Sequence, residues 1–265
     1  MLLPDDTLFR GAEKAMRILL SFLFALALIP QVRAATVADF RNLGFSPDGR
    51  HFAFMEYGVQ DGSGFPFASV FVIDLDRDAW AGPPVRIVLE KEAEDAREAM
   101  RMALRRAAPT LKRAGIAPLL TGRELFHAPP TEGTEPAITA VFSGWPWQSG
   151  DARWRYTLQL STFPLPGGDC IPEMTEGARG FALDVLTGDE NRRIRIYADR
   201  KVPASRHCPI AYAIDRVIRF TVPGGMNRDS RVRDVVIIRY GYQAFEGLDE
   251  RHLAIPVKLP EPSAR

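Results

Sequence analysis

The chain contains few of the residues on which metal and catalytic sites depend. Its 265 residues include two cysteines and four histidines, and the histidines are scattered: His51, His127, His207 and His252. The sequence also lacks the H-E-x-x-H, G-x-S-x-G, P-loop and G-x-G-x-x-G motifs of zinc hydrolases, serine hydrolases and nucleotide-binding enzymes. A serine-histidine-aspartate site stays open, because its members meet in space rather than in sequence. We expect no metal and no cofactor.

An excess of one charge is also absent. Lys and Arg number 34 and Asp and Glu 33, which gives a net charge of +1. Proteins that bind nucleic acids or anionic membrane surfaces carry clustered basic residues. The interspersed charges of this chain therefore predict no nucleic-acid partner and no membrane-surface role.

No hydrophobic run reaches the roughly 20 residues that a membrane-spanning helix needs. The longest, Ile18–Ile29, follows Met16 and Arg17 and precedes V-R-A at 32–34, which is typical of a signal peptide with its cleavage site. We expect residues 1–34 to be a signal peptide whose translation begins at Met16, since the preceding residues are acidic. The alternative is an uncleaved anchor. Cleavage leaves a periplasmic or secreted protein without a stable membrane anchor.

The two cysteines, Cys170 and Cys208, form an isolated even pair in an exported chain, which predicts a disulfide bond. In the chain-entropy model this bond stabilises the fold by roughly 4 kcal/mol. The alternative is a metal site that adds His207. Because adjacent residues of a strand point to opposite faces, His207 and Cys208 would diverge there, and the disulfide is favoured.

Alternation of apolar and polar residues predicts strands through most of the chain. Val235–Ile238 is apolar on both faces, which indicates a central strand, and Pro256 marks an edge strand. The other expected strands are 123–127, 138–143, 154–160, 180–186, 194–196, 218–222 and 253–257.

A hairpin is expected near the N-terminus, where two apolar runs flank Ser46-Pro47-Asp48-Gly49. This pattern is typical of a β-propeller blade, yet the chain has no second copy of it, and a propeller needs at least about four blades. A blade-like hairpin outside any propeller is therefore predicted.

Helix-forming residues gather at about 90–107, after a third expected strand at Ala68–Leu75. The expected apolar stripe is Ala96, Met100, Leu104 and Ala107, and Pro109 should end or restart the helix. The fold class predicted is α+β, mainly antiparallel sheet with one inserted amphipathic helix, in a single exported domain of residues 35–265.

Two polar segments, Glu56–Pro66 and Gly241–Ala254, each join strongly apolar strands. Since sites are often carried by loops on a rigid sheet, we expect both at one end of the sheet, where they would form the principal polar site. The candidate binding residues are Glu56, Asp61, Glu246, Asp249 and Arg251. The alternative is a pair of hairpin connections whose charges are solvated.

Two further clusters have structural interpretations. Asp74, Asp76 and Asp78 have the spacing of a calcium loop, but Ala79 and Val85 stand where glycine and glutamate are required, so a turn is expected. Three tryptophans could form a sugar platform, although a place in the core or at a sheet edge is favoured: Trp145, Trp147 and Trp154.

The stretches F-S-P-D-G-R-H-F-A-F-M-E-Y-G-V-Q-D-G-S-G-F-P at Phe45–Pro66 and F-E-G-L-D-E-R-H-L-A at Phe245–Ala254 resemble a family of predicted secreted bacterial proteins of unknown function. With the signal peptide, these segments bracket almost the whole mature chain. The resemblance implies export and a domain of conserved length. It implies no activity, cofactor or catalytic residue.

The leading functional hypothesis is a non-catalytic binding or accessory role, with an envelope or extracellular component as partner. It follows from the lack of any acid–base or metal constellation. The first alternative is a carboxylate-dependent hydrolase that acts on an envelope glycan, and it requires two carboxyl groups that converge in a cleft. A second alternative, an assembly subunit, requires an exposed apolar patch.

Overall fold

The computed structural model describes residues 36–90, 95–130, 135–144, 155–170, 176–187, 192–222, 232–244 and 247–260. Within these ranges the protein is built from antiparallel strands with a single long helix, and it forms neither a closed barrel nor a propeller. The predicted fold class, α+β and mainly antiparallel sheet, is confirmed. The expected signal peptide lies outside the described residues.

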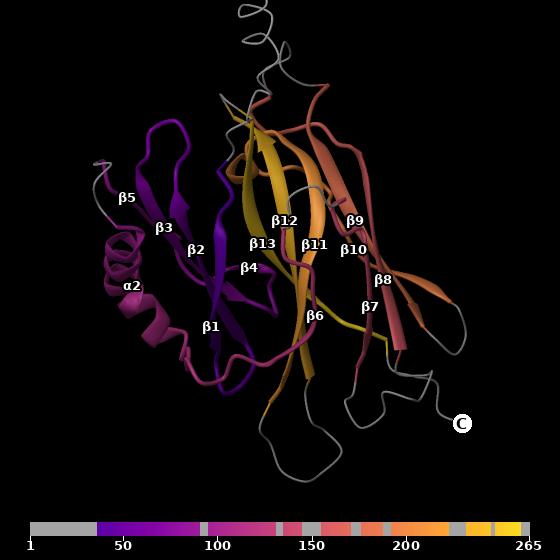
Figure 1. The fold of residues 1–265 in the computed structure, drawn as a ribbon. Coiled ribbons are helices and arrows are strands. Elements are labelled where there is room, and N and C mark those ends of the chain that lie inside the picture. The colour runs from indigo at the N-terminus through magenta and orange to yellow at the C-terminus, as the bar shows by residue number, and fades with distance from the viewer. Residues whose placement is uncertain are drawn as a thin grey trace, which may run out of the picture. The chain divides into compact units, whose positions relative to one another are not determined.

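The strands form three sheets (Figure 1). The N-terminal sheet has the order β1-β2-β3-β4, and β5 also pairs with β3: β1 Asp39–Phe45, β2 His51–Val59, β3 Pro66–Asp74, β4 Ala79–Trp80 and β5 Val85–Val88. The middle sheet has the order β13-β12-β11-β6: β6 Arg123–His127, β11 Pro209–Thr221, β12 Val232–Gln243 and β13 Leu248–Val257. The outer sheet has the order β10-β9-β8-β7: β7 Thr139–Ser143, β8 Arg155–Pro164, β9 Arg179–Thr187 and β10 Arg193–Ala198.

The middle sheet packs between the other two. On β12, Val235 and Ile237 join the apolar core shared with the N-terminal sheet, whereas Val236 and Ile238 join the core shared with the outer sheet. These consecutive residues point to alternate faces, and both faces are covered, which explains the unbroken apolar run. The prediction of a central strand is confirmed. Pro256 lies on β13, an edge strand of this sheet, as expected.

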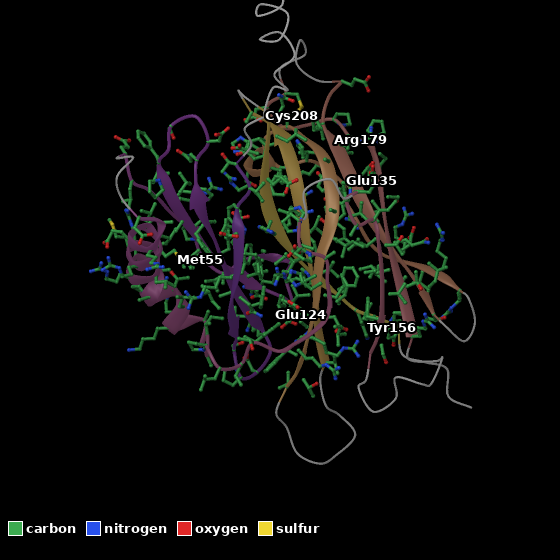
Figure 2. The ribbon with its side chains drawn as sticks, viewed as in Figure 1. Met55, Glu124, Glu135, Tyr156, Arg179 and Cys208 are labelled. Atoms are coloured by element: carbon green, nitrogen blue, oxygen red, sulfur yellow. A yellow bond between two sulfur atoms is a disulfide. The ribbon has the colours of Figure 1, made fainter. Side chains whose placement is uncertain are left out.

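The helix α2 (Ala96–Arg113) covers the outer face of the N-terminal sheet. Asp95 caps its first turn by accepting a hydrogen bond from the Arg97 N–H at 3.0 Å. The buried residues are Ala99, Ala103 and Ala107, of which only Ala107 was expected, and the expected Met100 and Leu104 are partly buried against the same core. The small alanine side chains let the helix lie close to the sheet, where it packs on Met55, which Figure 2 labels.

Two expectations for this helix are wrong. Pro109 lies inside α2, and the helix continues to Arg113, since Leu111 still packs on the sheet and holds the last turn in place. The helix also follows β5 rather than the third strand. The short strands β4 and β5 come first and extend the edge of the sheet next to β3.

The turn between β1 and β2 has the expected chemistry. The Ser46 hydroxyl donates to Asp48 Oδ1 at 2.5 Å, and the Arg50 N–H donates to the same oxygen at 3.0 Å. Both bonds lower the pKa of Asp48. Gly49 has φ = 67°, a left-handed conformation that glycine adopts without strain.

Candidate ligand-binding cleft

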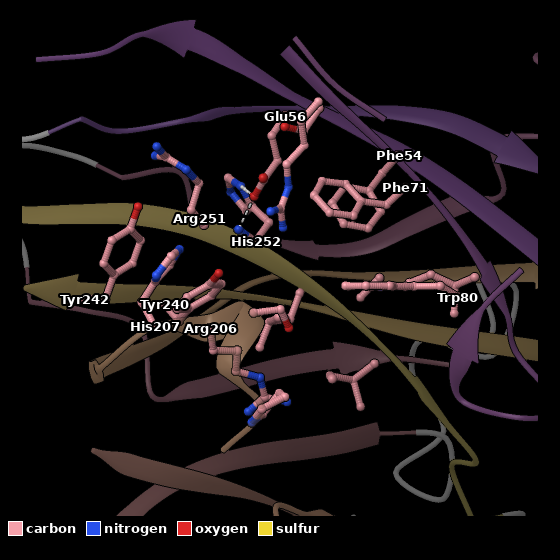
Figure 3. Close-up of a pocket in the computed structure, with 18 of the residues that line it drawn as sticks. Phe54, Glu56, Phe71, Trp80, Arg206, His207, Tyr240, Tyr242, Arg251 and His252 are labelled. Atoms are coloured by element: carbon pink, nitrogen blue, oxygen red, sulfur yellow. Dashed lines mark hydrogen bonds and ion pairs between the residues drawn. The ribbon is translucent and has the colours of Figure 1, made fainter. Parts of the chain in front are cut away.

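A cleft of about 840 Å³ lies between the inner face of the N-terminal sheet and the β12–β13 side of the middle sheet. Its third wall is the segment from Tyr197 to His207, which begins in the last two residues of β10 of the outer sheet. Figure 3 shows aromatic residues around one part of the cleft, and Glu56, Arg251, His252 and two tyrosines around another.

A polar row crosses the wall formed by the N-terminal sheet. Glu56 on β2 pairs with Ser69 on β3, which pairs in turn with Arg86 on β5. Directly paired residues of antiparallel strands point to the same face, so the carboxylate, hydroxyl and guanidinium all face the cleft. A half-buried sheet normally fills such a row with apolar side chains, and this one presents hydrogen-bonding groups instead.

Aromatic side chains lie beside the polar row. Phe54 and Phe71 are paired across β2 and β3 and stack with their ring centroids 4.8 Å apart. The next row leads from Ile73 to Trp80 on β4. Trp80 lines the cleft and is 49% exposed, whereas Phe54 is 2% exposed. The accessible aromatic surface here is therefore that of Trp80.

The middle sheet contributes two tyrosines of β12 to the cleft, from the face that packs on the outer sheet. Tyr242 donates its hydroxyl to Asp249 Oδ2 at 3.1 Å, and burial raises its pKa to about 12. Tyr240 is 5% exposed, and its hydroxyl has no hydrogen-bond partner among the described residues. Burial, reinforced by the charge of Glu56, also raises the pKa of Tyr240. Both phenols are therefore neutral donors at physiological pH.

The third wall is fixed by Asp199. Its carboxylate accepts hydrogen bonds from the Tyr197 hydroxyl at 2.9 Å, the Arg206 guanidinium at 2.8 Å and the backbone N–H of Phe181 at 3.0 Å. Burial opposes the charge of Arg206, but Asp199 outweighs burial and raises the pKa of Arg206. Because Phe181 belongs to β9, these bonds fasten the wall to the outer sheet.

The predicted disulfide is confirmed, and it lies at the end of this wall. Cys170 and Cys208 are bonded with their Cα atoms 4.8 Å apart, and Figure 2 labels Cys208. The preceding residue, His207, has φ = 56°, an unfavourable conformation for a side chain with a Cβ. Its ring lies 4.7 Å from that of Tyr242, and its Nδ1 is 3.1 Å from Asp169 Oδ2. Cys170 follows Asp169 and Cys208 follows His207, so the disulfide joins the chain segments on both sides of the contact between Asp169 and His207.

Three of the five predicted binding residues come together around Thr36, which is 3% exposed. The backbone N–H of Asp61 donates to the Thr36 hydroxyl at 2.9 Å, and the Thr36 N–H donates to Asp249 Oδ1 at 3.3 Å. Arg251 Nη1 donates to the Thr36 carbonyl at 3.4 Å. Asp61 therefore takes part through its backbone and not through its carboxylate. The residue that joins the three is Thr36, which carries no charge.

The fourth predicted residue, Glu56, accepts a hydrogen bond from the backbone N–H of His252. The expected polar segments therefore meet, but they are not two long loops. Glu56 is a buried residue of β2, and residues 248–254 belong to β13, which pairs along β12. The fifth, Glu246, and all three tryptophans of the expected sugar platform lie outside the described residues.

Arg251 is held by the protein on several sides. Its guanidinium lies 4.6 Å above the Phe67 ring and 3.5 Å from Asp249, and it donates to the Glu250 carbonyl at 2.9 Å. These contacts fix its orientation on the wall of the cleft.

The aspartate cluster at the end of β3 forms a turn, as expected, since Asp74 Oδ1 accepts hydrogen bonds from the N–H groups of Asp76 and Arg77.

Sequence reasoning missed most of the cleft: Trp80, Arg86, Tyr197, Asp199, Arg206, Tyr240 and Tyr242. One signal was available. Phe52, Phe54 and Glu56 occupy alternate positions of one strand, so the acidic residue had to share the buried face of the phenylalanines. The other missed residues come from strands that only the tertiary fold brings together.

The fold and the cleft define a class of disulfide-bonded α+β protein, with three packed sheets and a cleft between two of them. The chain belongs to the family described as predicted secreted protein (DUF2259), whose model matches residues 53–258. The resemblance noted from the sequence is thereby confirmed, as is the expectation of a secreted protein. No curated protein is significantly similar to the chain. Within the described residues no helix is long and apolar enough to cross a membrane.

Proposed function

We propose that this secreted protein is a non-catalytic binding protein whose cleft takes up a small component of the cell envelope or the surrounding medium. The observation that carries the proposal is the cleft itself. Its volume of about 840 Å³ lies in the range of about 300–1,000 Å³ that is typical of ligand sites. Its walls come from all three sheets, so the fold as a whole maintains it.

The chemistry of the walls supports the same proposal. Ser69 and Tyr240 offer hydroxyl groups without a partner among the described residues, and Trp80 offers an exposed ring. A ligand that accepts hydrogen bonds from these two hydroxyl groups would form bonds that the described residues leave open.

No specific observation favours the hydrolase alternative. A glycosidase needs two carboxyl groups that are free to act on the substrate. In this cleft Asp199 already accepts three hydrogen bonds, and Glu56 accepts the N–H of His252. Both carboxylates therefore stabilise the walls, which leaves Asp78 as the one remaining carboxylate among the described residues that line the cleft.

Thermal denaturation with fractionated envelope extracts tests the proposal, because a ligand that binds only the folded state raises the melting temperature. Ser69→Trp should fill the cleft, whereas Val141→Trp adds the same side chain at an exposed position of β7. We expect one fraction to stabilise the wild type and the Val141→Trp variant but not the Ser69→Trp variant. Stabilisation of all three proteins by every active fraction would argue against a ligand in this cleft.

A further inference from the structure

The charged residues that line the cleft fall into two groups. Most have a partner in the protein: Asp199 binds Arg206, Glu56 binds the N–H of His252, and Arg251 lies beside Asp249. Asp78 lies close enough to Arg206 for their charges to interact. The hydrogen-bonded and ion-paired groups are satisfied within the protein. Asp78, in contrast, is an exposed carboxylate of the cleft whose side chain has no hydrogen bond or ion pair to another described residue.

The second group consists of Arg86, Arg200 and Lys201. All three are exposed residues of the cleft, and none has a hydrogen bond or ion pair to another described residue. Arg86 ends the polar row on the N-terminal sheet, whereas Arg200 and Lys201 follow β10 on the third wall. Two different walls therefore present three positive charges to the same space against the single unpaired carboxylate of Asp78, which favours an anionic ligand.

The uncharged groups indicate what the anion is attached to. The Tyr240 hydroxyl lines the cleft without a hydrogen-bond partner among the described residues, and so does the Ser69 hydroxyl in the polar row beside Arg86. Trp80 adds a half-exposed ring at the edge of the cleft. A compact ligand with several hydroxyl groups and one apolar face matches these features.

An acyl chain fits the cleft less well. Phe54 and Phe71 are 2% and 9% exposed and stack on each other, so they fill the apolar part of the cleft with their own side chains. These two rings therefore offer little surface to a hydrocarbon tail. The exposed large apolar side chains of the cleft are Trp80 and Val88, and the test below includes a lysolipid for this reason.

We propose that the cleft recognises an acidic sugar. Its carboxylate would lie between Arg86 and the Arg200–Lys201 pair, its hydroxyls would bind Ser69 and Tyr240, and its ring would pack on Trp80. This inference rests on the proposed function and names the class of ligand. The sugar acid can be a free monosaccharide or part of a glycan, since both present the same carboxylate and ring.

Isothermal titration with matched acidic and neutral probes tests the inference. The probes are N-acetylmuramic acid against N-acetylglucosamine, glucuronic acid against glucose, and a disaccharide that contains N-acetylmuramic acid. We expect at least one acidic probe to bind about tenfold more tightly than its neutral partner, because charge-assisted hydrogen bonds are the stronger ones. Binding of the monosaccharide supports a free sugar acid, and binding of the disaccharide alone supports a glycan.

The variant Arg86→Ala/Arg200→Ala/Lys201→Ala should reduce that affinity by about tenfold or more. Its control, Arg41→Ala/Arg123→Ala/Lys258→Ala, removes the same charge from exposed residues outside the cleft and should bind like the wild type. Equal affinity for acidic and neutral probes, an unaffected triple variant, or binding of lysophosphatidylglycerol but of no sugar would overturn the inference. So would the absence of binding by every sugar probe. The comparison of Ser69→Trp with Val141→Trp in envelope extracts would still decide the proposed function separately.

Discussion

Glu56 on β2 accepts a hydrogen bond from the backbone N–H of His252 on β13, so one carboxylate links the N-terminal sheet to the middle sheet. The two residues are 3% and 6% exposed. The His252 Nδ1 atom lies 3.4 Å from the same carboxylate oxygen without hydrogen-bonding geometry. This bond lies on the wall of the cleft, so stability and the shape of the site depend on the same residue.

Glu56→Ala should lower the free energy of unfolding by about 1–3 kcal/mol, because the N–H of His252 would be left buried without a partner. Glu56→Gln should retain most of the stability, since its amide oxygen can accept the same bond. Urea denaturation of the three proteins measures the difference. If the alanine variant matched the wild type, the link between the sheets would contribute nothing to stability.

Arg251→Ala should also destabilise the fold, by about 1–3 kcal/mol, since it removes the contact with the Phe67 ring and the bonds to two backbone carbonyls. Arg251→Lys should recover only part of this, because lysine lacks the planar guanidinium. Arg123→Ala, at an exposed position of β6, is the control. If Arg251→Ala kept its melting temperature but lost ligand binding, Arg251 would act in ligand binding and not in the stability of the fold.

Reduction of Cys170–Cys208 should cost the fold up to about 4 kcal/mol, as expected for a loop of this length. It should also weaken ligand binding, because the bond holds the wall that carries His207. The Cys170→Ser/Cys208→Ser variant should behave in the same way without reductant. Chemical denaturation with and without reductant measures the loss of stability, and ligand titration under the same two conditions measures the change in affinity. Ligand affinity that survives reduction would separate the disulfide from the cleft.

The tyrosines predict a loss of stability at alkaline pH. Burial raises the pKa of Tyr197, Tyr212 and Tyr242 to about 12, whereas in the unfolded chain their pKa is about 10. The unfolded chain therefore loses these protons first. The stabilisation is complete below about pH 10 and falls as the pH rises toward about 12. Phenolate absorbance and urea denaturation across this interval measure the effect, and Tyr197→Phe should make the decline shallower. A decline of the same slope in that variant would rule out Tyr197 as a contributor.

Apart from the short strands β4 and β5, local patterns were sufficient to predict the strands, the disulfide and the central position of β12. They depend on alternation, turn residues and an isolated cysteine pair, all of which can be read within short windows. The path of α2 through Pro109 could not be predicted in this way. Packing of Leu111 on the sheet outweighs the local preference of proline to end a helix.

The candidate site was predictable only in part. Glu56, Asp249 and Arg251 stand out as charged residues beside apolar strands, and the structure places them on or next to the cleft. Arg86, Tyr240 and the Asp199–Arg206 pair carry no local signal, because their roles depend on which strands pair and which sheets pack. Register and layer order are tertiary properties, and these determine most of the cleft.

Native mass spectrometry of protein isolated without denaturation from cells that export it tests most directly whether the cleft holds a ligand. We expect a bound small molecule that is released on denaturation, present in the wild type and in Val141→Trp and absent from Ser69→Trp. Native and denatured masses that agree for the wild type, or the same bound molecule in Ser69→Trp, would contradict it.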